Sequence, residues 1–198
     1  MKILYTCITG GYNKLIPVVK QKGWKYICFT DQDITSDIWE VIKVPSGEKR
    51  SREVKILAHK YLPQHDISVW IDGNVEYIGD LDKLIEGKNY CLMAHPERDN
   101  VWDEARVCKK LNKDKPEIID RQMERYKNGG WDGKGMVAST MLIRRNTPEN
   151  SKVNEMWWKE VETESRRDPL SFNYVTWKLN FKYETFPFLE NCHYSSHL

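Results

Sequence analysis

Short, almost wholly apolar runs alternate with segments of helical periodicity through the first half of this chain, and this alternation restricts its fold more than any other feature. Residues 3–8 form the clearest run, and a strand that is apolar at nearly every position is typical of a sheet covered on both faces. Strands that alternate with helical segments predict an α/β sheet with crossover helices. We expect strands at residues 3–8, 24–29, 39–44, 67–71, 90–94, 136–143 and 181–186.

Helical spacing is clearest at residues 51–62, where Val54, Leu57, Ala58 and Tyr61 share one face. Further helices are expected at residues 80–85, 101–111, 116–126, 149–164 and 170–177. The sequence has 198 residues and contains no internal repeat, low-complexity stretch or linker. A chain of this length fits one domain, so we expect a single domain over residues 1–198.

The composition excludes several classes of function. The formal net charge of +2 provides no overall field to attract nucleic acid or an anionic membrane. No apolar stretch approaches the length of a membrane span, and a strand pattern begins at the N-terminus, where a signal peptide would lie. The five cysteines show no CxxC spacing and several lie in apolar runs, which predicts buried free thiols in a reducing compartment. We therefore expect a cytoplasmic protein without a membrane span.

The strongest candidate for chemistry is the sequence Asp72-Gly73-Asn74, which follows the expected strand at residues 67–71. In an open α/β sheet, ligands bind beyond the carboxyl ends of the strands. Two oxygen-bearing side chains at a spacing of two can face the same side of an extended segment. Such a pair suits Mn²⁺ or Mg²⁺ bridging a diphosphate. The alternative is an ordinary turn, since Asp, Gly and Asn all favour turns.

Two further features suit a nucleotide ligand. Arg52, Lys55 and His59 form a basic stripe on the expected helix 51–62, which fits a diphosphate, although a solvated helix face gives the same pattern. The loop Thr9-Gly10-Gly11-Tyr12 follows the first strand. Its glycines allow the backbone to approach a ligand, and Tyr12 is placed to stack on a base or ribose. The loop is not a dinucleotide-binding GxGxxG sequence.

The second half contains three weaker candidates. Asp168 precedes Pro169 at the expected start of a helix, so it either caps that helix or positions an acceptor hydroxyl. Arg166 and Arg167 stand beside it and suit anionic groups. The glycine-rich residues 129–133, which include Trp131, are expected to close over a ligand. Histidines occur in His95-Pro96-Glu97-Arg98 and in the tail at His193 and His197, and each is either a metal ligand or an ordinary histidine.

Taken together, these segments resemble a known family. Blocks at residues 5–12, 26–31, 55–62, 70–74, 95–99, 157–158 and 165–168 are similar to the glycosyltransferase-like domain of plant mucilage-related proteins. This domain was long catalogued as one of unknown function and is also found in bacteria and viruses. Residues 62–84 are in addition similar to glycosyltransferase family 8, in which a helix precedes the sequence YLDAD.

The resemblance implies a GT-A-like fold, with a mostly parallel, mixed central sheet flanked by helices, and a nucleotide-sugar donor, UDP-linked by preference. It implies that Asp72 and Asn74 replace the DxD metal motif and that His193 completes the metal shell. Asp168 is then the catalytic candidate near the acceptor. The expected donor-binding residues are Thr9, Gly10, Gly11, Tyr12, Asp31, Arg52, Lys55, His95, Arg98, Trp131 and Arg167.

Two departures from the family pattern leave alternatives open. Asn74 is an amide where the DxD motif has its second carboxylate, a loss that Glu76 would compensate, and Pro169 stands where related domains have Gln. A non-catalytic nucleotide- or glycan-binding module of the same fold would tolerate both changes. A metal-dependent hydrolase is a further alternative, but it needs several His and carboxylate ligands, and no HxxEH-like helix occurs. The acceptor (glycan, protein, small molecule or modified nucleobase) and the stereochemistry, retaining or inverting, stay open.

Overall fold

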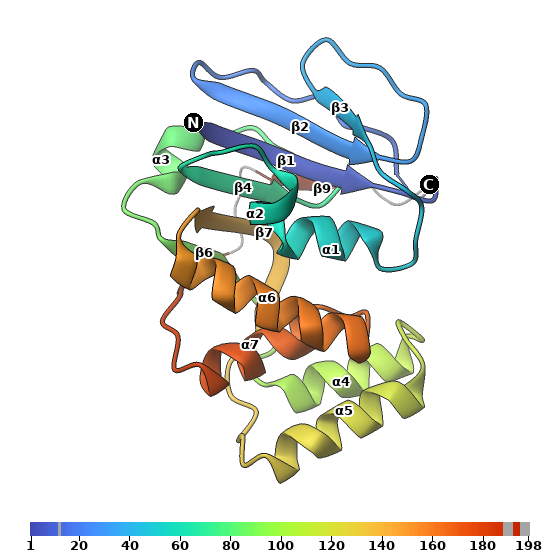
Figure 1. Cartoon of the computed structure of the whole chain (residues 1–198). Helices are drawn as coiled ribbons and strands as arrows, with labels where there is room; N and C mark the ends of the chain where they lie inside the picture. The colour runs from blue at the N-terminus through green and yellow to red at the C-terminus, as the bar shows by residue number, and fades with distance from the viewer. Residues whose placement is uncertain (12, 188–191, 195–198) are drawn as a thin grey trace.

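A seven-stranded sheet forms the centre of the computed structural model, which describes residues 1–11, 13–187 and 192–194 (Figure 1). Strands β1 to β4 run parallel to one another, β7 runs antiparallel to both of its neighbours, and β8 runs parallel to β6. This confirms the expected mostly parallel, mixed sheet. The strand order is β3 (Glu40–Lys43), β2 (Trp24–Thr30), β1 (Lys2–Ile8), β4 (Ile67–Ile71), β7 (Val137–Arg145), β6 (Tyr90–Ala94) and β8 (Glu184–Phe186).

Helices cover the sheet, as the continuous apolar runs predict. Figure 1 shows α1, α2 and α6 in front of the sheet. A second sheet pairs β5 (Val75–Tyr77) with β9 (Cys192–Tyr194). No helix among the described residues is both long and apolar enough to cross a bilayer. The helices are α1 (Arg50–Ile56), α2 (Ala58–Tyr61), α3 (Leu81–Ile85), α4 (Val101–Lys110), α5 (Pro116–Asn128), α6 (Pro148–Thr163) and α7 (Pro169–Lys178).

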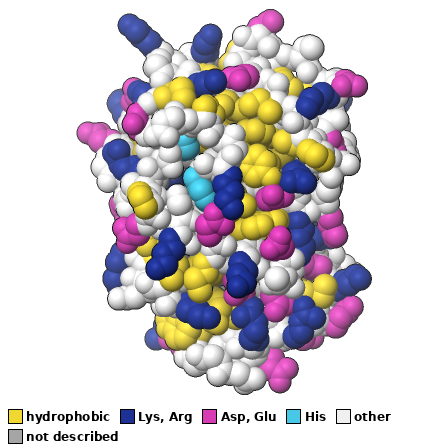
Figure 2. All heavy atoms as spheres, viewed as in Figure 1, with side chains coloured by type: hydrophobic (Ala, Val, Ile, Leu, Met, Phe, Trp, Pro, Cys, Tyr) yellow, Lys and Arg dark blue, Asp and Glu magenta, His cyan; other side chains and the backbone are white. Residues whose placement is uncertain are grey.

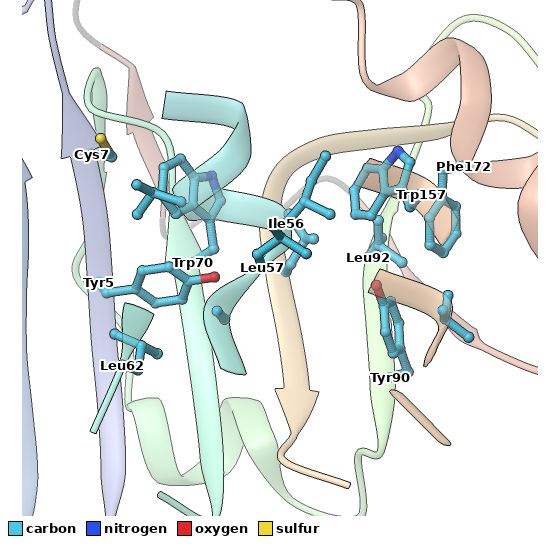
Figure 3. Packing of buried hydrophobic residues seen from close by; sticks show 14 of the residues in the cluster. Tyr5, Cys7, Ile56, Leu57, Leu62, Trp70, Tyr90, Leu92, Trp157 and Phe172 are labelled. Carbon is cyan, nitrogen blue, oxygen red and sulfur yellow. The ribbon is translucent and has the colours of Figure 1, made fainter. Parts of the chain in front are cut away.

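Alternate residues of the central strands enter two different cores. Ile3 and Tyr5 of β1 belong to the core beneath α1, α6 and α7, in which Figure 3 shows Trp70, Trp157 and neighbouring side chains. Leu4, one position away, belongs to the core on the opposite face. Because both faces are buried, the strands have no polar side, which explains why they appear in the sequence as unbroken apolar runs.

A third core joins α4 and α5 to α7 at the end of the molecule farthest from β2 and β3 (Figure 1). Its aromatic members are Tyr126, Trp131 and Tyr174. The rings of Tyr126 and Tyr174 stack with centroids 3.8 Å apart. Aromatic side chains bury more area than any others, so this cluster stabilises the attachment of the helical hairpin to the rest of the fold.

The surface carries no broad field of one sign on the face drawn in Figure 2, where basic and acidic side chains are interspersed. This agrees with the net charge of +2. All five cysteines are free and buried, as predicted. Burial raises the pKa of Cys28 to about 12 and that of Cys91 to about 11, so both thiols are protonated at neutral pH.

The helix expected at residues 51–62 is interrupted at Leu57, which has φ −90° and ψ 41°. The guanidinium of Arg144 donates hydrogen bonds to the backbone carbonyls of Lys55 and Ile56, and the hydroxyl of Tyr5 also donates to that of Lys55. These carbonyls would otherwise accept from backbone N–H groups one turn later. The backbone N–H of Lys60 instead bonds to the carbonyl of Leu57. Side chains of the core therefore divide the predicted helix into α1 and α2.

Substitution of Gly133 would test the packing of Trp102 beside the third core. Its φ is +79°, and an added Cβ would lie 2.2 Å from Nε1 of Trp102, whereas Gly130 has a φ of +85° with nothing within 4 Å. Gly133→Ala is expected to lower the free energy of unfolding by about 3 kcal/mol, because it combines backbone strain with a clash. Gly130→Ala, the matched control, introduces strain alone and is expected to cost about 1–2 kcal/mol. Urea denaturation measures both, and equal losses would contradict the packing described.

Candidate functional site

Asp72 lies at the carboxyl end of β4, the position where the sequence predicted ligand chemistry. Its side chain is 36% exposed. Its Oδ1 accepts a hydrogen bond from Nε1 of Trp70 at 2.8 Å. A Cβ at Gly73 would meet Cγ2 of Ile8 at 2.2 Å, so only glycine fits between Asp72 and Asn74. The turn is therefore packed against the end of β1, which restricts the position of Asp72.

Lys55 of α1 joins Asp72 to Asp168. Its ammonium lies 3.3 Å from Oδ1 of Asp72 and 3.0 Å from Oδ2 of Asp168, and it donates to Oγ of Ser139 at 2.9 Å. Lys55 is only 4% exposed. It also lies 5.6 Å from the centre of the Trp70 ring. The interpretation of this residue as part of a solvated helix face is therefore wrong.

The other two members of the basic stripe have different surroundings. Arg52 is half-buried and its charge acts on Asp168, so it stays near the carboxylates. His59 instead lies 3.0 Å from Oε1 of Glu155 on α6. The interruption at Leu57 changes the direction of the residues after it, so His59 no longer shares a face with Lys55.

Asp168 does not cap α7. Its side chain makes no capping hydrogen bond, and its Oδ2 accepts instead from Oγ of Ser139 at 2.6 Å and from Lys55. The residue is 5% exposed. Burial by itself would raise the pKa of Asp168, but the charges of Lys55 and Arg52 and the hydrogen bonds from Ser139 and Lys55 hold that pKa below its usual range. The carboxylate is therefore ionised at neutral pH.

Ser139 is a site residue that the sequence analysis missed. It lies in β7, is 4% exposed, and contacts both Lys55 and Asp168. The signal available was a hydroxyl residue inside an otherwise apolar strand, where a buried polar group requires partners.

A second polar cluster joins His95 and Arg98 to α4. Nε of Arg98 donates to Oε2 of Glu104 at 2.5 Å, and Nε2 of His95 lies 3.5 Å from the same oxygen. Nδ1 of His95 faces the backbone N–H groups of Glu97 and Arg98 at 3.2 Å each, so the imidazole also holds its own loop. Glu104 is 5% exposed and was another residue that the sequence analysis missed. Its charge offsets that of Arg98.

His95 is neutral at pH 7 because burial is the largest influence on it and lowers the pKa of the imidazole. Arg167 links this cluster to the first. Burial opposes its charge, but Cys108, Asp168 and Glu104 together raise the pKa of its guanidinium. Its Nε is buried and has no hydrogen-bond partner among the described residues.

The glycine loop lies at the same edge of the sheet, after β1. The backbone N–H of Gly10 lies 3.1 and 3.0 Å from the two carboxylate oxygens of Asp31, which follows β2. Gly10 and Gly11 have φ values of +72° and +67°, a conformation that side chains rarely adopt. Thr9 is half-buried at the start of this loop, and Tyr12 lies outside the described residues.

Trp131 and His193 make contacts in this structure that differ from those expected. Trp131 is 4% exposed and packs within 6 Å of the rings of Trp102, Tyr126 and Tyr174, so its side chain belongs to the third core where a closing loop was expected. His193 lies opposite Glu76 in the β5–β9 pairing, with Nδ1 3.5 Å from Oε2, and is 62% exposed. It contacts Glu76 where a metal shell with Asp72 was expected.

Within residues 1–11, 13–187 and 192–194, no group of three His, Cys, Asp or Glu side chains is arranged to hold a metal ion. The oxygen ligands of Asp72 and Asn74 nevertheless match the preference of a hard divalent cation, and the partial exposure of Asp72 leaves it within reach of solvent. The chemistry of these two side chains is thus compatible with a hard divalent cation, although they supply only two of its ligands.

Comparison with known families shows to which family the chain belongs. Residues 24–197 match the model of the TOD1/MUCI70, glycosyltransferase-like domain. The chain belongs to this family. The TOD1/MUCI70 domain described here is 27% identical over 165 residues to the probable hexosyltransferase MUCI70 of Arabidopsis thaliana. The match covers 73% of this chain but only 28% of the plant protein, so the chain spans little more than a quarter of that relative.

The fold is also similar to that of a solved glycosyltransferase. The crystal structure of mouse xyloside xylosyltransferase 1 in its apo form superposes with a TM-score of 0.52. The superposition covers 93% of this chain and 84% of the mouse chain, with 8% sequence identity. At that identity the likeness concerns the fold alone, and it agrees with the expected GT-A-like architecture. The similarity to glycosyltransferase family 8 stays a prediction.

Proposed function

We propose that this TOD1/MUCI70 domain transfers a sugar from a nucleotide-sugar donor, UDP-linked by preference, to a hydroxyl group of an acceptor. The observation that carries the proposal is the buried Lys55 ammonium between the carboxylates of Asp72 and Asp168 at the carboxyl edge of the sheet. Family membership supports glycosyl transfer in general. The location of the site is supported by the general rule that ligands of α/β folds bind beyond the carboxyl ends of the strands.

The donor would lie across the ends of β1, β2 and β4. The loop of Gly10 and Gly11, held by Asp31, lies where the nucleoside would bind, because its backbone can approach a ligand without side chains intervening. The positive charges of Lys55 and Arg52, which lie near Asp72 and Asp168, would attract the diphosphate to this edge. Arg167, whose charge interacts with that of Asp168, would add a further positive charge to this region.

Asp72 and Asn74 would hold Mn²⁺ or Mg²⁺, which in such a site neutralises the charge that develops on the departing diphosphate. Asn74 contributes an amide oxygen and no charge, so the cation would depend mainly on Asp72. Glu76 and His193 contact each other in this structure. We therefore base the cation site on Asp72 and Asn74 and treat His193 as a further ligand to be tested by substitution.

Asp168 would act by charge. In the reaction the acceptor oxygen would form a bond to the anomeric carbon, the bond from that carbon to the diphosphate would break, and the acceptor proton would pass to an oxygen of the departing diphosphate. A carboxylate whose pKa lies below its usual range is a weak base. We therefore assign to Asp168 the stabilisation of the positive charge that develops on the sugar, in preference to removal of the acceptor proton.

The test is to incubate the protein with Mn²⁺ and a panel of UDP-, GDP- and TDP-sugars, and to measure donor hydrolysis and binding by calorimetry. Asp72→Ala is expected to weaken metal-dependent donor binding at least about tenfold, because its carboxylate is the only charged ligand proposed for the cation. Asp33→Ala, which removes an exposed carboxylate paired with Lys43, is the matched control and should bind as the wild type does.

Absence of both turnover and metal-dependent binding for every donor would contradict the proposed function. Tight donor binding without hydrolysis, in the presence of acceptor mixtures, would favour the alternative of a non-catalytic binding module. The two departures from the family pattern, Asn74 and Pro169, are the sequence features that favour this alternative.

A further inference from the structure

A groove of about 770 Å³ lies between the α1–α2 segment and α6. It is on the outer side of α1, whereas Lys55 extends from the inner side of the same helix toward Asp72 and Asp168. The groove is therefore separate from the candidate site. On the face drawn in Figure 2, hydrophobic side chains lie between these helices with charged side chains of both signs around them. The apolar lining consists of Leu57, Tyr61, Met156 and Trp158.

Tyr61 forms a rigid wall of this groove. Its hydroxyl donates to Oε1 of Glu53 at 2.7 Å and accepts from Arg50 at 3.0 Å. Its ring contacts Phe29 in an edge-to-face arrangement with centroids 5.8 Å apart. Because the ring and the hydroxyl are both held in place, the side chain of Tyr61 loses little conformational freedom when a ligand packs against it.

The adjacent tryptophans of α6 have different environments. Trp157 is fully buried, and its Nε1 donates to the backbone carbonyl of Asp168 at 2.9 Å. Trp158 is half-buried and lines the groove. Its indole N–H has no hydrogen-bond partner among the described residues. Trp158 thus offers an aromatic surface to an occupant of the groove.

The rim of the groove determines the chemistry of that occupant. Three lysines and three glutamates surround the apolar lining, so the rim has no net charge and selects neither an anion nor a cation. Lys60 of α2 and Glu155 of α6 approach to 2.8 Å, so the rim is polar where the two helices meet. The apolar face of a partner helix would remove these charges from water without replacing their hydrogen bonds. A polyhydroxylated ligand can bond to both signs.

We propose that this groove binds a neutral oligosaccharide chain, with a sugar ring packed against Trp158 and Tyr61 and its hydroxyl groups bonded to the charged rim. The inference rests on the proposed function in one respect, because it identifies the acceptor class as a neutral glycan chain. Binding to the groove itself requires neither donor nor metal.

Affinity gel electrophoresis tests the proposal with hydroxyethyl cellulose, galactomannan and dextran as neutral probes and polygalacturonate as an anionic one. At least one neutral polysaccharide is expected to retard the wild-type chain. Trp158→Ala is expected to weaken that binding at least fivefold. The matched control is Trp177→Ala, which removes a 45% exposed tryptophan of α7 outside the groove and should leave binding unchanged.

A second variant guards against a folding defect in Trp158→Ala. Lys152→Ala combined with Lys159→Ala alters two exposed rim residues and is expected to weaken binding two- to fivefold without changing the melting temperature. Equal retardation of Trp158→Ala and Trp177→Ala would overturn the proposal. So would retardation by polygalacturonate alone, by no polysaccharide, or a dimer in sedimentation velocity that Trp158→Ala dissociates. Because these measurements contain no nucleotide, their failure is distinguishable from a failure of sugar transfer.

Discussion

Asp168→Asn is expected to lower sugar transfer by about 10²–10⁴-fold, the range that loss of one charge-stabilising group in an enclosed site produces. The asparagine keeps the size of the side chain and its place beside Ser139, but it removes the negative charge that lies 3.0 Å from Lys55. The measurement is turnover at saturating donor, with circular dichroism to establish that the variant is folded.

Asp114→Asn provides the matched control. Asp114 accepts hydrogen bonds from Ser165 and from the backbone N–H of Arg166, so it supports the same loop without contacting Lys55. Its substitution is expected to lower the melting temperature and leave turnover within about threefold of wild type. The reason is that Asp114 shares no contact with Lys55, so its loss should act independently of the charges at the site. Equal activity losses in the two variants would show that Asp168 acts through the loop and not through its charge.

The pKa of Asp168 predicts how stability depends on pH. Its folded-state pKa is lowered, so the folded protein binds this proton less readily than the unfolded chain does. The resulting stability is fully present above the unfolded pKa and is lost as pH falls through the folded pKa. Asp168→Asn removes this contribution, so its stability should change less with pH below about 5 than that of the wild type.

Lys55→Met is expected to lower the free energy of unfolding at pH 7 by about 3–5 kcal/mol, the cost of leaving a buried charge without its partner. Lys55 is 4% exposed and Asp168 is 5% exposed, so water cannot fully replace the missing ammonium. The deficit should shrink as pH falls, because Asp168 loses its charge once it is protonated. Urea denaturation at pH 7 and pH 4 measures both effects.

Lys60→Met is the control for this prediction. Lys60 pairs with Glu155 on the surface, where the two side chains are 52% and 46% exposed. Such pairs contribute at most about 1 kcal/mol, so little change is expected. If Lys55→Met and Lys60→Met destabilise the protein equally, or if the deficit of Lys55→Met does not depend on pH, the buried ion pair does not stabilise the fold as described.

Most of the fold was predictable because its central strands are buried on both faces. Residues 67–71 and 90–94 were expected as strands, and the structure has β4 and β6 at those positions. The interruption at Leu57 was not predictable, because it depends on Arg144, a residue almost ninety positions away. The three-residue strands β5 and β9 were also missed, since segments so short carry no periodicity.

The candidate site was predictable in its parts more than in its arrangement. Asp72 followed from its position after a buried strand, and Asp168 and Lys55 were singled out by type and neighbourhood. That one ammonium would join the two carboxylates required the spatial arrangement of α1, β4 and α7. Ser139 and Glu104 were missed because single polar residues within apolar or amphipathic segments resemble ordinary variation. Trp131 was misplaced because a glycine-rich neighbourhood indicates a loop and does not indicate which side chains of that loop are buried.

The contacts of Arg144 have a consequence for the chemistry at the sheet edge. Its guanidinium holds the main chain of Lys55 from the interior, while the other end of the same lysine touches the carboxylates. The position of the ammonium thus depends on hydrogen bonds made in the buried core, away from the sheet edge. Substitution of Tyr5 or Arg144 would therefore shift Lys55 and change the proposed site from the interior of the protein, with every carboxylate at the sheet edge left in place.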